Sequence, residues 1–264
     1  MKIPFVDIGT QYKFLRKKIL NKFDNLSQKG DYILGEELEL FEKEFAKYCG
    51  TKYAVGVGNG SDALTFSLIA LGIGKGDEII IPGNSFFSTA WTVVNVGAKP
   101  VFADVKDDYN IDPHDITNKI SKKTKAIIPV HLTGRIAAMD MIKKIAKINN
   151  LFIIEDAAQA VGATFSGKKA GSIGDLGCFS LHPLKNLHVH GDGGVITTNN
   201  KSIFKFLIKI RNHGLKNRDE CEFWGYNSRL DNIQAGIARI KLKYIDRWNK
   251  RFNQIAKFYS SKLT

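Results

Sequence analysis

The chain has 264 residues, 44% of them hydrophobic, and a formal net charge of +13. A chain of this length and composition can bury a substantial core, so we expect a globular protein of one large domain, or of one domain and part of another. It has neither an apolar run long enough to cross a bilayer nor a secretory signal, and its lysines are spread over helical segments, so we expect a cytoplasmic protein that binds neither membranes nor nucleic acid.

The first predicted elements are two helices separated by a glycine-rich segment. Residues 35–50, GEELELFEKEFAKYCG, form an amphipathic pattern that Gly50 closes. Residues 55–60, VGVGNG, then run into a second helical pattern, whose leucines recur at helical spacing until the stop at Gly72. The chain therefore leads from a helix through a glycine-rich turn into another helix.

Short apolar runs rich in β-branched residues come next. They are residues 78–82, 100–105, 126–132 and 151–157. Continuous apolar character without alternation indicates strands covered on both faces, and such strands are usually parallel. A helical pattern at 139–150 lies between the last two runs. This alternation of strand and helix patterns predicts an α/β protein of three layers, α/β/α, with a mainly parallel central sheet.

The C-terminal part is a long basic helical pattern. It covers residues 229–263, with a possible bend or break, and it continues to the end of the sequence. An amphipathic helix with nothing after it to pack on resembles the start of a further domain. We therefore expect residues 1–240 to form a large domain with an N-terminal helical segment, and residues 241–264 to begin a truncated C-terminal small domain.

Several chemically distinctive residues follow the predicted strands. They are Ser85, Phe86, His131, Asp156, Gln159 and, after the short strand CFSL, Lys185. In an open parallel sheet, ligands bind outside the carboxyl ends of the strands. We therefore expect these side chains to face one cleft.

The glycine-rich turn could hold an anion at the same cleft. Asn59, Gly60 and Ser61 precede a helix, where exposed N–H groups and the positive end of the helix dipole favour a phosphate. The spacing is not the dinucleotide fingerprint, because Ser61 stands where that motif needs glycine. A plain helix start, with Ser61 or Asp62 as the N-cap residue, explains the pattern equally well.

Three other side chains each have a structural and a chemical interpretation. Asp156 follows an apolar strand, where it either caps a turn or pairs with a buried cationic group such as a protonated ring nitrogen. Phe86 is either a core residue or a cover for a flat ring. Lys185 is either a surface lysine or an amine held for Schiff-base chemistry. Phosphate site, acid, aromatic ring and lysine together match pyridoxal phosphate better than any other common cofactor.

The histidines of the segment FSLHPLKNLHVHGDGG, residues 179–194, raise the alternative of a metal site. His182, His188 and His190 do not follow a compact zinc pattern, and no cysteine or carboxylate pair completes one. We therefore expect no metal. The odd number of cysteines, without C-x-x-C spacing, also argues against a disulfide framework.

Many motifs of the chain are those of one known family. The chain resembles the DegT/DnrJ/EryC1/StrS sugar aminotransferases, which are pyridoxal-phosphate enzymes of the aspartate-aminotransferase fold type. The likeness covers nearly the whole sequence and rests on PFVDIGTQY, GEELELFEKEFAKYCGTKYAVGVGNGSDAL, GDEIIIPGNSFFSTA, EDAAQAVGA, GDLGCFSLHPLKNL followed by GDGG, and GYNSRLDNIQAGIARIKL.

The resemblance implies roles for individual residues. Lys185 would form the Schiff base with the cofactor and then move the proton at the substrate carbon. Asp156 would pair with the pyridine nitrogen, Gln159 would lie near the ring oxygen, and Phe86 would stack on the ring.

The resemblance also implies a phosphate site and a dimer. Gly60, Ser61 and Ser180 would bind the phosphate. Asn227, in GYNSRLD, would reach into the site of a partner subunit, so that a homodimer shares its active sites.

The implied reaction moves an amino group from L-glutamate to a keto-sugar, commonly one linked to a nucleotide, in the synthesis of amino sugars or cell-surface polysaccharides. Some relatives replace the lysine by histidine and dehydrate sugars, but this sequence keeps Lys185, which favours transamination. The family often has small residues where His188 and His190 stand, so we interpret these as substrate-side differences. The alternative outside this class, a regulatory or nucleic-acid-binding protein, rests on the charge of +13.

Overall fold

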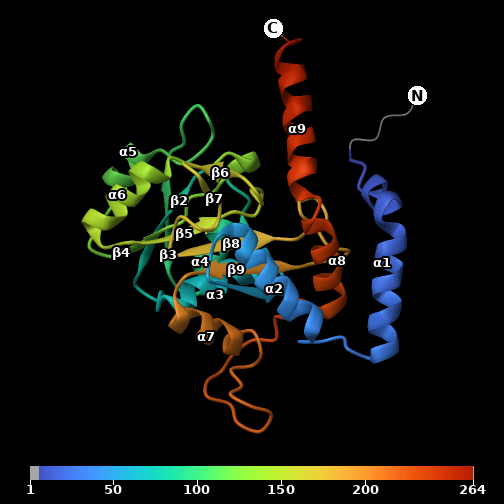
Figure 1. Ribbon diagram of the computed structural model, residues 1–264. Coiled ribbons are helices and arrows are strands. Elements are labelled where there is room, and N and C mark those ends of the chain that lie inside the picture. Colours follow the sequence, from blue (N-terminus) through green and yellow to red (C-terminus); the bar gives the residue numbers. More distant parts are fainter. Residues whose placement is uncertain (1–5, 264) are drawn as a thin grey trace.

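The computed structural model describes residues 6–263 and contains a central seven-stranded sheet (Figure 1). Its spatial order is β1-β9-β8-β5-β4-β2-β3. The strands are β1 (Tyr53–Val57), β2 (Glu78–Pro82), β3 (Lys99–Ala103), β4 (Thr124–Ile127), β5 (Phe152–Asp156), β8 (Leu176–Ser180) and β9 (Gly194–Thr198), and β6 (Thr164–Phe165) and β7 (Lys168–Lys169) form a separate short hairpin.

Helices cover both faces of the sheet. They are α1 (Gly9–Lys29), α2 (Glu36–Cys49), α3 (Gly60–Ala70), α4 (Ser88–Asn95), α5 (Pro113–Lys119), α6 (Met139–Asn149), α7 (Lys201–Ile210), α8 (Asn232–Leu242) and α9 (Ile245–Ser260), with a short 3₁₀ turn at Leu132–Gly134. Residues of α3, α4 and α7 form one buried cluster with the sheet, and residues of α2, α6 and α8 belong to clusters on the other side. The three-layer α/β/α architecture predicted from the sequence is confirmed.

The apolar runs form strands because both of their faces are buried. Ile79 and Ile81 of β2 pack with α3, whereas Ile80 between them packs with α6 on the opposite face. Successive side chains of a strand point to opposite sides, so a strand in the middle layer needs apolar residues at every position. Strands β3, β2, β4, β5 and β8 are paired in parallel.

Two strands at one side of the sheet were absent from the sequence prediction. Strand β9 pairs antiparallel with both β8 and β1. Both missed strands carry glycine, in YAVGV and GVITT, and glycine weakens a strand pattern because it has no side chain to pack. The central sheet is therefore mainly, but not entirely, parallel.

The long C-terminal helical pattern is broken into two helices. Lys243 and Tyr244 separate α8 from α9, and beyond Ile245 the side chains of α9 are mostly exposed. In Figure 1, α9 extends away from the sheet. The domain boundary expected after residue 240 stays a prediction, and it falls within the last turn of α8.

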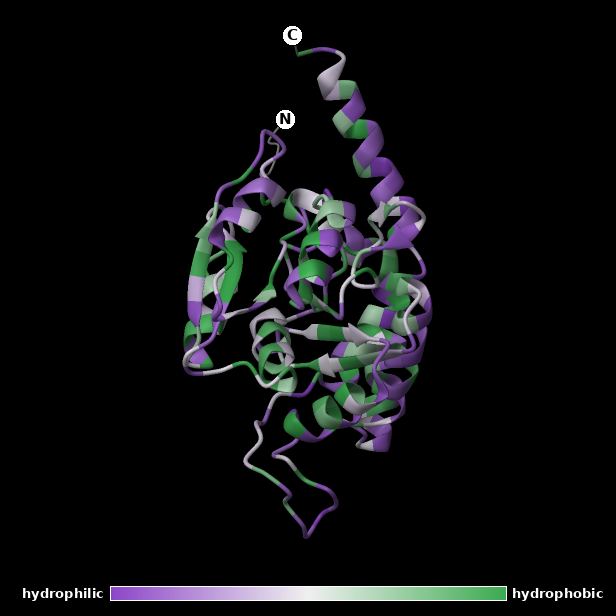
Figure 2. Cartoon of the chain, turned by 90° about the vertical axis from the view of Figure 1, so that its left-hand side faces the viewer, coloured by the Kyte–Doolittle hydropathy of each residue, from purple (hydrophilic) through white to green (hydrophobic). Residues whose placement is uncertain are grey.

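One segment protrudes from the body between α7 and α8. It is visible at the bottom of Figure 2, and it carries Trp224, whose side chain is 96% exposed. Within residues 6–263, no helix is both long and apolar enough to span a membrane.

Candidate active site

Asp156 is the last residue of β5 and is almost completely buried. Its Oδ2 accepts a hydrogen bond of 2.9 Å from Thr89 Oγ1, and its Oδ1 accepts one of 3.2 Å from the Ala158 N–H. Burial raises the pKa of this carboxyl, although these two bonds and the nearby positive charges of Lys185 and His131 act in the opposite direction. A buried acid of this kind gains most from a cationic partner.

A second buried acid lies beside Asp156 and already has its partner. The side chains of Glu155 and His131 are both fully buried, with 2.9 Å between Glu155 Oε2 and His131 Nε2. Burial raises the pKa of Glu155, but His131 and the N–H groups of Gly171 and Gly174 outweigh it, so the pKa is lowered overall. Glu155 thus supports the loop after β7, and Asp156 is the acid left for a ligand.

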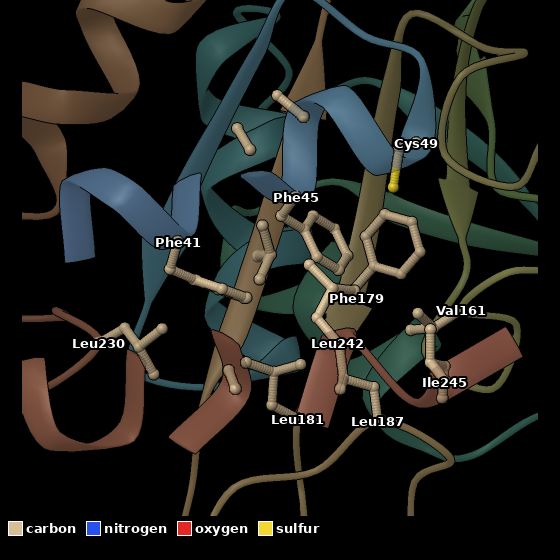
Figure 3. Packing of buried hydrophobic residues seen from close by; sticks show 14 of the residues in the cluster. Phe41, Phe45, Cys49, Val161, Phe179, Leu181, Leu187, Leu230, Leu242 and Ile245 are labelled. Carbon is tan, nitrogen blue, oxygen red and sulfur yellow. The ribbon is translucent and has the colours of Figure 1, made fainter. Parts of the chain in front are cut away.

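The loop that carries Lys185 is closed at its base. The Val189 N–H donates to the Leu181 carbonyl at 2.9 Å, and the Leu181 N–H donates to the Gly193 carbonyl at 2.7 Å. Figure 3 shows Leu181 and Leu187 packed in the core beneath α2, next to Phe179. Apolar anchors therefore fix both ends of the loop and leave Lys185 at its tip, where its side chain is only partly buried.

The three histidines of this segment have different neighbours. His182 Nδ1 accepts a bond of 3.2 Å from the Leu184 N–H, and His188 Nδ1 contacts the Lys185 carbonyl oxygen at 3.1 Å. The ring of His190 lies edge-on to that of Tyr12, with 5.8 Å between the ring centroids. Within residues 6–263, no group of three or more His, Cys, Asp or Glu side chains is arranged to hold a metal ion.

The neighbour of Lys185 in the sequence is tied to α9. Asn186 Nδ2 donates to the Val161 carbonyl at 2.7 Å and to Asn249 Oδ1 at 3.1 Å, and Asn249 Nδ2 donates to the same carbonyl at 2.9 Å. The Lys185 loop, the turn after β5 and the first turns of α9 are therefore connected through one backbone oxygen.

The glycine-rich turn ends beside β8 at the start of α3. A Cβ atom added at Gly60 would lie 2.8 Å from Ser180 Cβ, so only glycine allows this approach. The N-cap residue is Asn59, whose side chain accepts the Asp62 N–H at 2.8 Å. The expectation that Ser61 or Asp62 caps the helix is therefore wrong, because the N-cap lies two residues before Ser61. The start of α3 at Gly60 therefore lies against Ser180, and a helix N-terminus beside a hydroxyl group suits an anion.

Helix α4 joins the acid and the glycine-rich turn. Ser61 Oγ donates to Ser88 Oγ at 3.0 Å, and the next residue, Thr89, holds Asp156. Thr89 Oγ1 also lies 2.8 Å from Ser85 Oγ. The sequence prediction missed Ser88 and Thr89, and its only signal for them was a pair of hydroxyl residues directly after the loop that contains Phe86.

The remaining predicted residues, Phe86, Gln159 and Asn227, are partly or largely exposed. Phe86 is 63% exposed, and its ring centroid lies 4.5 Å from that of Phe87. The side chain of Gln159 accepts the Thr133 N–H at 2.8 Å. Asn227 is exposed. Its neighbour Ser228 donates to Asp62 Oδ2 at 2.6 Å, which places this segment next to the glycine-rich turn.

A cavity of about 980 Å³ opens over Lys185. Its walls come from the segment before α1, the 3₁₀ turn, the turn after β5, the Lys185 loop and α9. Of the predicted site residues, Gln159 and Lys185 line it. The structure therefore gathers the acid, the lysine and the glycine-rich turn at one edge of the sheet, beside a space large enough for a ligand.

Known proteins are similar to this chain in both sequence and structure. A model of the DegT/DnrJ/EryC1/StrS aminotransferase family matches residues 13–264. A protein of Geobacillus stearothermophilus named "Pleiotropic regulatory protein" is 42% identical over 98% of this chain and 70% of its own length. A "dTDP-3-amino-3,6-dideoxy-alpha-D-galactopyranose transaminase" of Aneurinibacillus thermoaerophilus is 46% identical over 97% of this chain and 71% of its own. The crystal structure of S. venezuelae DesV "in complex with ketimine intermediate" superimposes with a TM-score of 0.97 at 40% identity, over 100% of this chain and 71% of that one.

Proposed function

The chain belongs to the DegT/DnrJ/EryC1/StrS aminotransferase family, and from this premise we propose that it transfers an amino group to a nucleotide-linked keto-sugar with pyridoxal 5'-phosphate as its cofactor. The observation that carries the proposal is Asp156, a buried carboxyl with a raised pKa at the edge of the sheet where the Lys185 loop lies. A buried acid that lacks a strong cationic partner fits the protonated ring nitrogen of this cofactor.

The other residues present also fit this group. The tight contact of Gly60 with Ser180, beside Ser61 at the start of α3, offers backbone and hydroxyl groups to a phosphate. Phe86 is exposed and available to cover the ring, and Gln159 lines the same cavity as Lys185. When bound, the cofactor supplies an electron sink for the carbon at which the amino group is exchanged.

The chain itself supplies the groups that hold and move protons. Asp156 keeps a proton on the ring nitrogen, because an ionised buried acid stabilises the cationic form of its partner. The amine of Lys185 would take a proton from the carbon of the amino donor in one half of the reaction and deliver a proton to the carbon of the sugar in the other. Gln159, in the turn after β5, and Thr133, in the 3₁₀ turn, form a polar wall over this chemistry.

The proposed class of substrate is based on the names of two relatives. The Aneurinibacillus protein is named for a dTDP-linked amino sugar, and a protein of Acidithiobacillus ferrooxidans, 41% identical, is named "UDP-N-acetyl-3-dehydro-alpha-D-glucosamine 3-aminotranferase". A net charge of +13 favours the approach of such anionic ligands. L-glutamate is the proposed amino donor, and amino-sugar or polysaccharide synthesis in the cytoplasm is the proposed setting.

The function can be tested with the purified chain. We expect a yellow protein after addition of pyridoxal phosphate, an absorbance change when L-glutamate is added, and an aminated product when a panel of nucleotide-linked keto-sugars is analysed by mass spectrometry. A colourless chain that takes up no cofactor and instead binds nucleic acid with a steep dependence on salt would contradict the proposal. A dehydrated product without nitrogen would indicate the dehydratase reaction.

The segment between α7 and α8 is proposed to complete the site of a second copy. Trp224 is 96% exposed on the protruding segment, and Tyr226 and the neighbouring Asn227 are also exposed. Phe86 and Phe87, at the site, are 63% and 66% exposed. Large exposed aromatic groups at both places are typical of surfaces that are covered on association. The proposed assembly is a homodimer in which each copy lends Asn227 to the other.

Mixing two inactive variants tests this shared site. Asn227→Ala and Lys185→Ala dimers are each expected to be inactive, since every site lacks one residue. After subunit exchange, half of the dimers are mixed and one of their two sites has both residues, so roughly a quarter of the wild-type activity is expected to return. As a control, mixing Lys185→Ala with Asp156→Asn must restore nothing, if both residues act within one chain. No recovery in the first mixture would contradict the shared site.

A further inference from the structure

The peptide groups on both sides of Lys185 are held by the loop itself. The Lys185 N–H donates to the His182 carbonyl at 2.8 Å. On the other side, the Lys185 carbonyl oxygen lies 3.1 Å from Nδ1 of His188. The first contact is an ordinary backbone turn, but the second depends on one side chain.

The direction of the second bond follows from its partner. A carbonyl oxygen only accepts hydrogen bonds, so Nδ1 of His188 must carry the proton and donate it. Burial lowers the pKa of His188 to about 4, and the positive charge of Lys241 acts in the same direction, as does His190 to a smaller extent. The ring is therefore neutral near pH 7, with its single proton on Nδ1.

The position of the His188 ring is fixed by its surroundings. His188 is 4% exposed, and the residues on either side of it, Leu187 and Val189, are completely or almost completely buried. Leu187 lies in the same core cluster as Phe179 and Leu181 (Figure 3). The positive charge of Lys241, buried on α8, also lowers the pKa of His188 and so disfavours a second positive charge there. A ring held in this way offers its Nδ1–H at a constant position.

We propose that His188 is a positioning residue that fixes the direction of the Lys185 backbone by donating a hydrogen bond to its carbonyl oxygen. The inference rests on the proposed function of Lys185 but concerns a contact that exists without the cofactor. Lys185 lies at the tip of a loop, where its backbone is otherwise held by the turn at His182 and by the anchored side chain of Asn186. A small rotation of this peptide would move the amine away from the reacting carbon, and misplacement of a reacting group slows catalysis strongly.

Two amide variants separate this role from simple packing. The amide nitrogen of asparagine overlaps the position of Nδ1, whereas that of glutamine overlaps the position of Nε2. We expect His188→Gln to reduce kcat, and the rate at which borohydride fixes pyridoxal phosphate to Lys185, by about three- to tenfold, with little change in KM for the keto-sugar. His188→Asn is expected to restore most of both rates. Equal losses in the two variants, or no loss in either, would overturn the proposal.

A second measurement needs no cofactor. In the wild-type chain labelled with ¹⁵N-histidine, we expect the NMR shifts of His188 at pH 7 to show a neutral ring protonated at Nδ1. A ring protonated at Nε2, or a doubly protonated ring, would overturn the proposal. If the chain takes up no pyridoxal phosphate, the proposed function fails, but this measurement still decides whether His188 donates to the Lys185 carbonyl.

Discussion

Replacing Lys185 by alanine is expected to lower the rate of amino transfer by about a thousandfold or more, because the substitution removes both the Schiff-base amine and the general acid–base group. The side chain is only partly buried, and the Leu181–Val189 hydrogen bond that closes its loop involves backbone atoms alone. The fold is therefore expected to survive. The decisive measurement is a single turnover with L-glutamate, followed by the absorbance of the cofactor.

A surface lysine provides the matched control for this change. Lys201 lies exposed at the start of α7, so Lys201→Ala removes the same charge without touching the site. It is expected to leave turnover unchanged. The Lys185→Ala variant is expected to bind pyridoxal phosphate without covalent attachment and to unfold at nearly the wild-type temperature. Wild-type turnover in Lys185→Ala would refute the role assigned to this residue.

Replacing Asp156 by asparagine is expected to lower the rate of amino transfer by about a hundredfold or more. The variant keeps the shape of the side chain, and the amide oxygen can still accept the bond from Thr89. It loses the negative charge that holds a proton on the ring nitrogen of the cofactor, and electrostatic groups of this kind contribute several orders of magnitude to a rate. Asp107→Asn, at an exposed position, is the matched control.

The same variant gives a second result that does not depend on activity. Because burial raises the pKa of Asp156, the folded cofactor-free chain binds this proton more tightly than the unfolded chain does. The contribution of Asp156 to the free energy of unfolding is therefore largest at low pH and falls as the pH rises above about 4. Asp156→Asn is expected to remove this fall, which urea unfolding at several pH values measures. A variant less stable than the wild type at pH 7 would contradict the raised pKa.

Much of the fold followed from the apolar strand patterns. Strand β2 has the bounds that its sequence predicts, since the run Glu78–Pro82 is apolar on both faces. The strands β1 and β9 did not follow, because their sequences contain glycine and their place in the sheet depends on pairing, of β9 with β8 and of β1 with β9. Pairing with a strand that is distant in the sequence cannot be predicted from local composition.

The candidate site was predicted in the same uneven way. Asp156 and Lys185 could be inferred, because a carboxylate after an apolar strand and a lysine in a glycine-bordered loop are unusual. Thr89 and Ser88 could not, since their contacts depend on how α4 packs over the strand ends. The donor role of His188 also depends on the closure of its loop, so from the sequence His188 could be interpreted only as a substrate-side difference.

Helix α4 carries two hydroxyl groups that contact opposite ends of the candidate site. The hydroxyl groups of Ser88 and Thr89, which contact Ser61 and Asp156, lie one residue apart on the same helical turn. Their Cα atoms are therefore about 1.5 Å apart along the helix axis, and both hydroxyl groups stay on one rigid element when the surrounding loops move. A ligand that bound at both ends of the proposed site, with its phosphate near Ser61 and its ring nitrogen near Asp156, would therefore meet two contacts whose relative positions are set by α4.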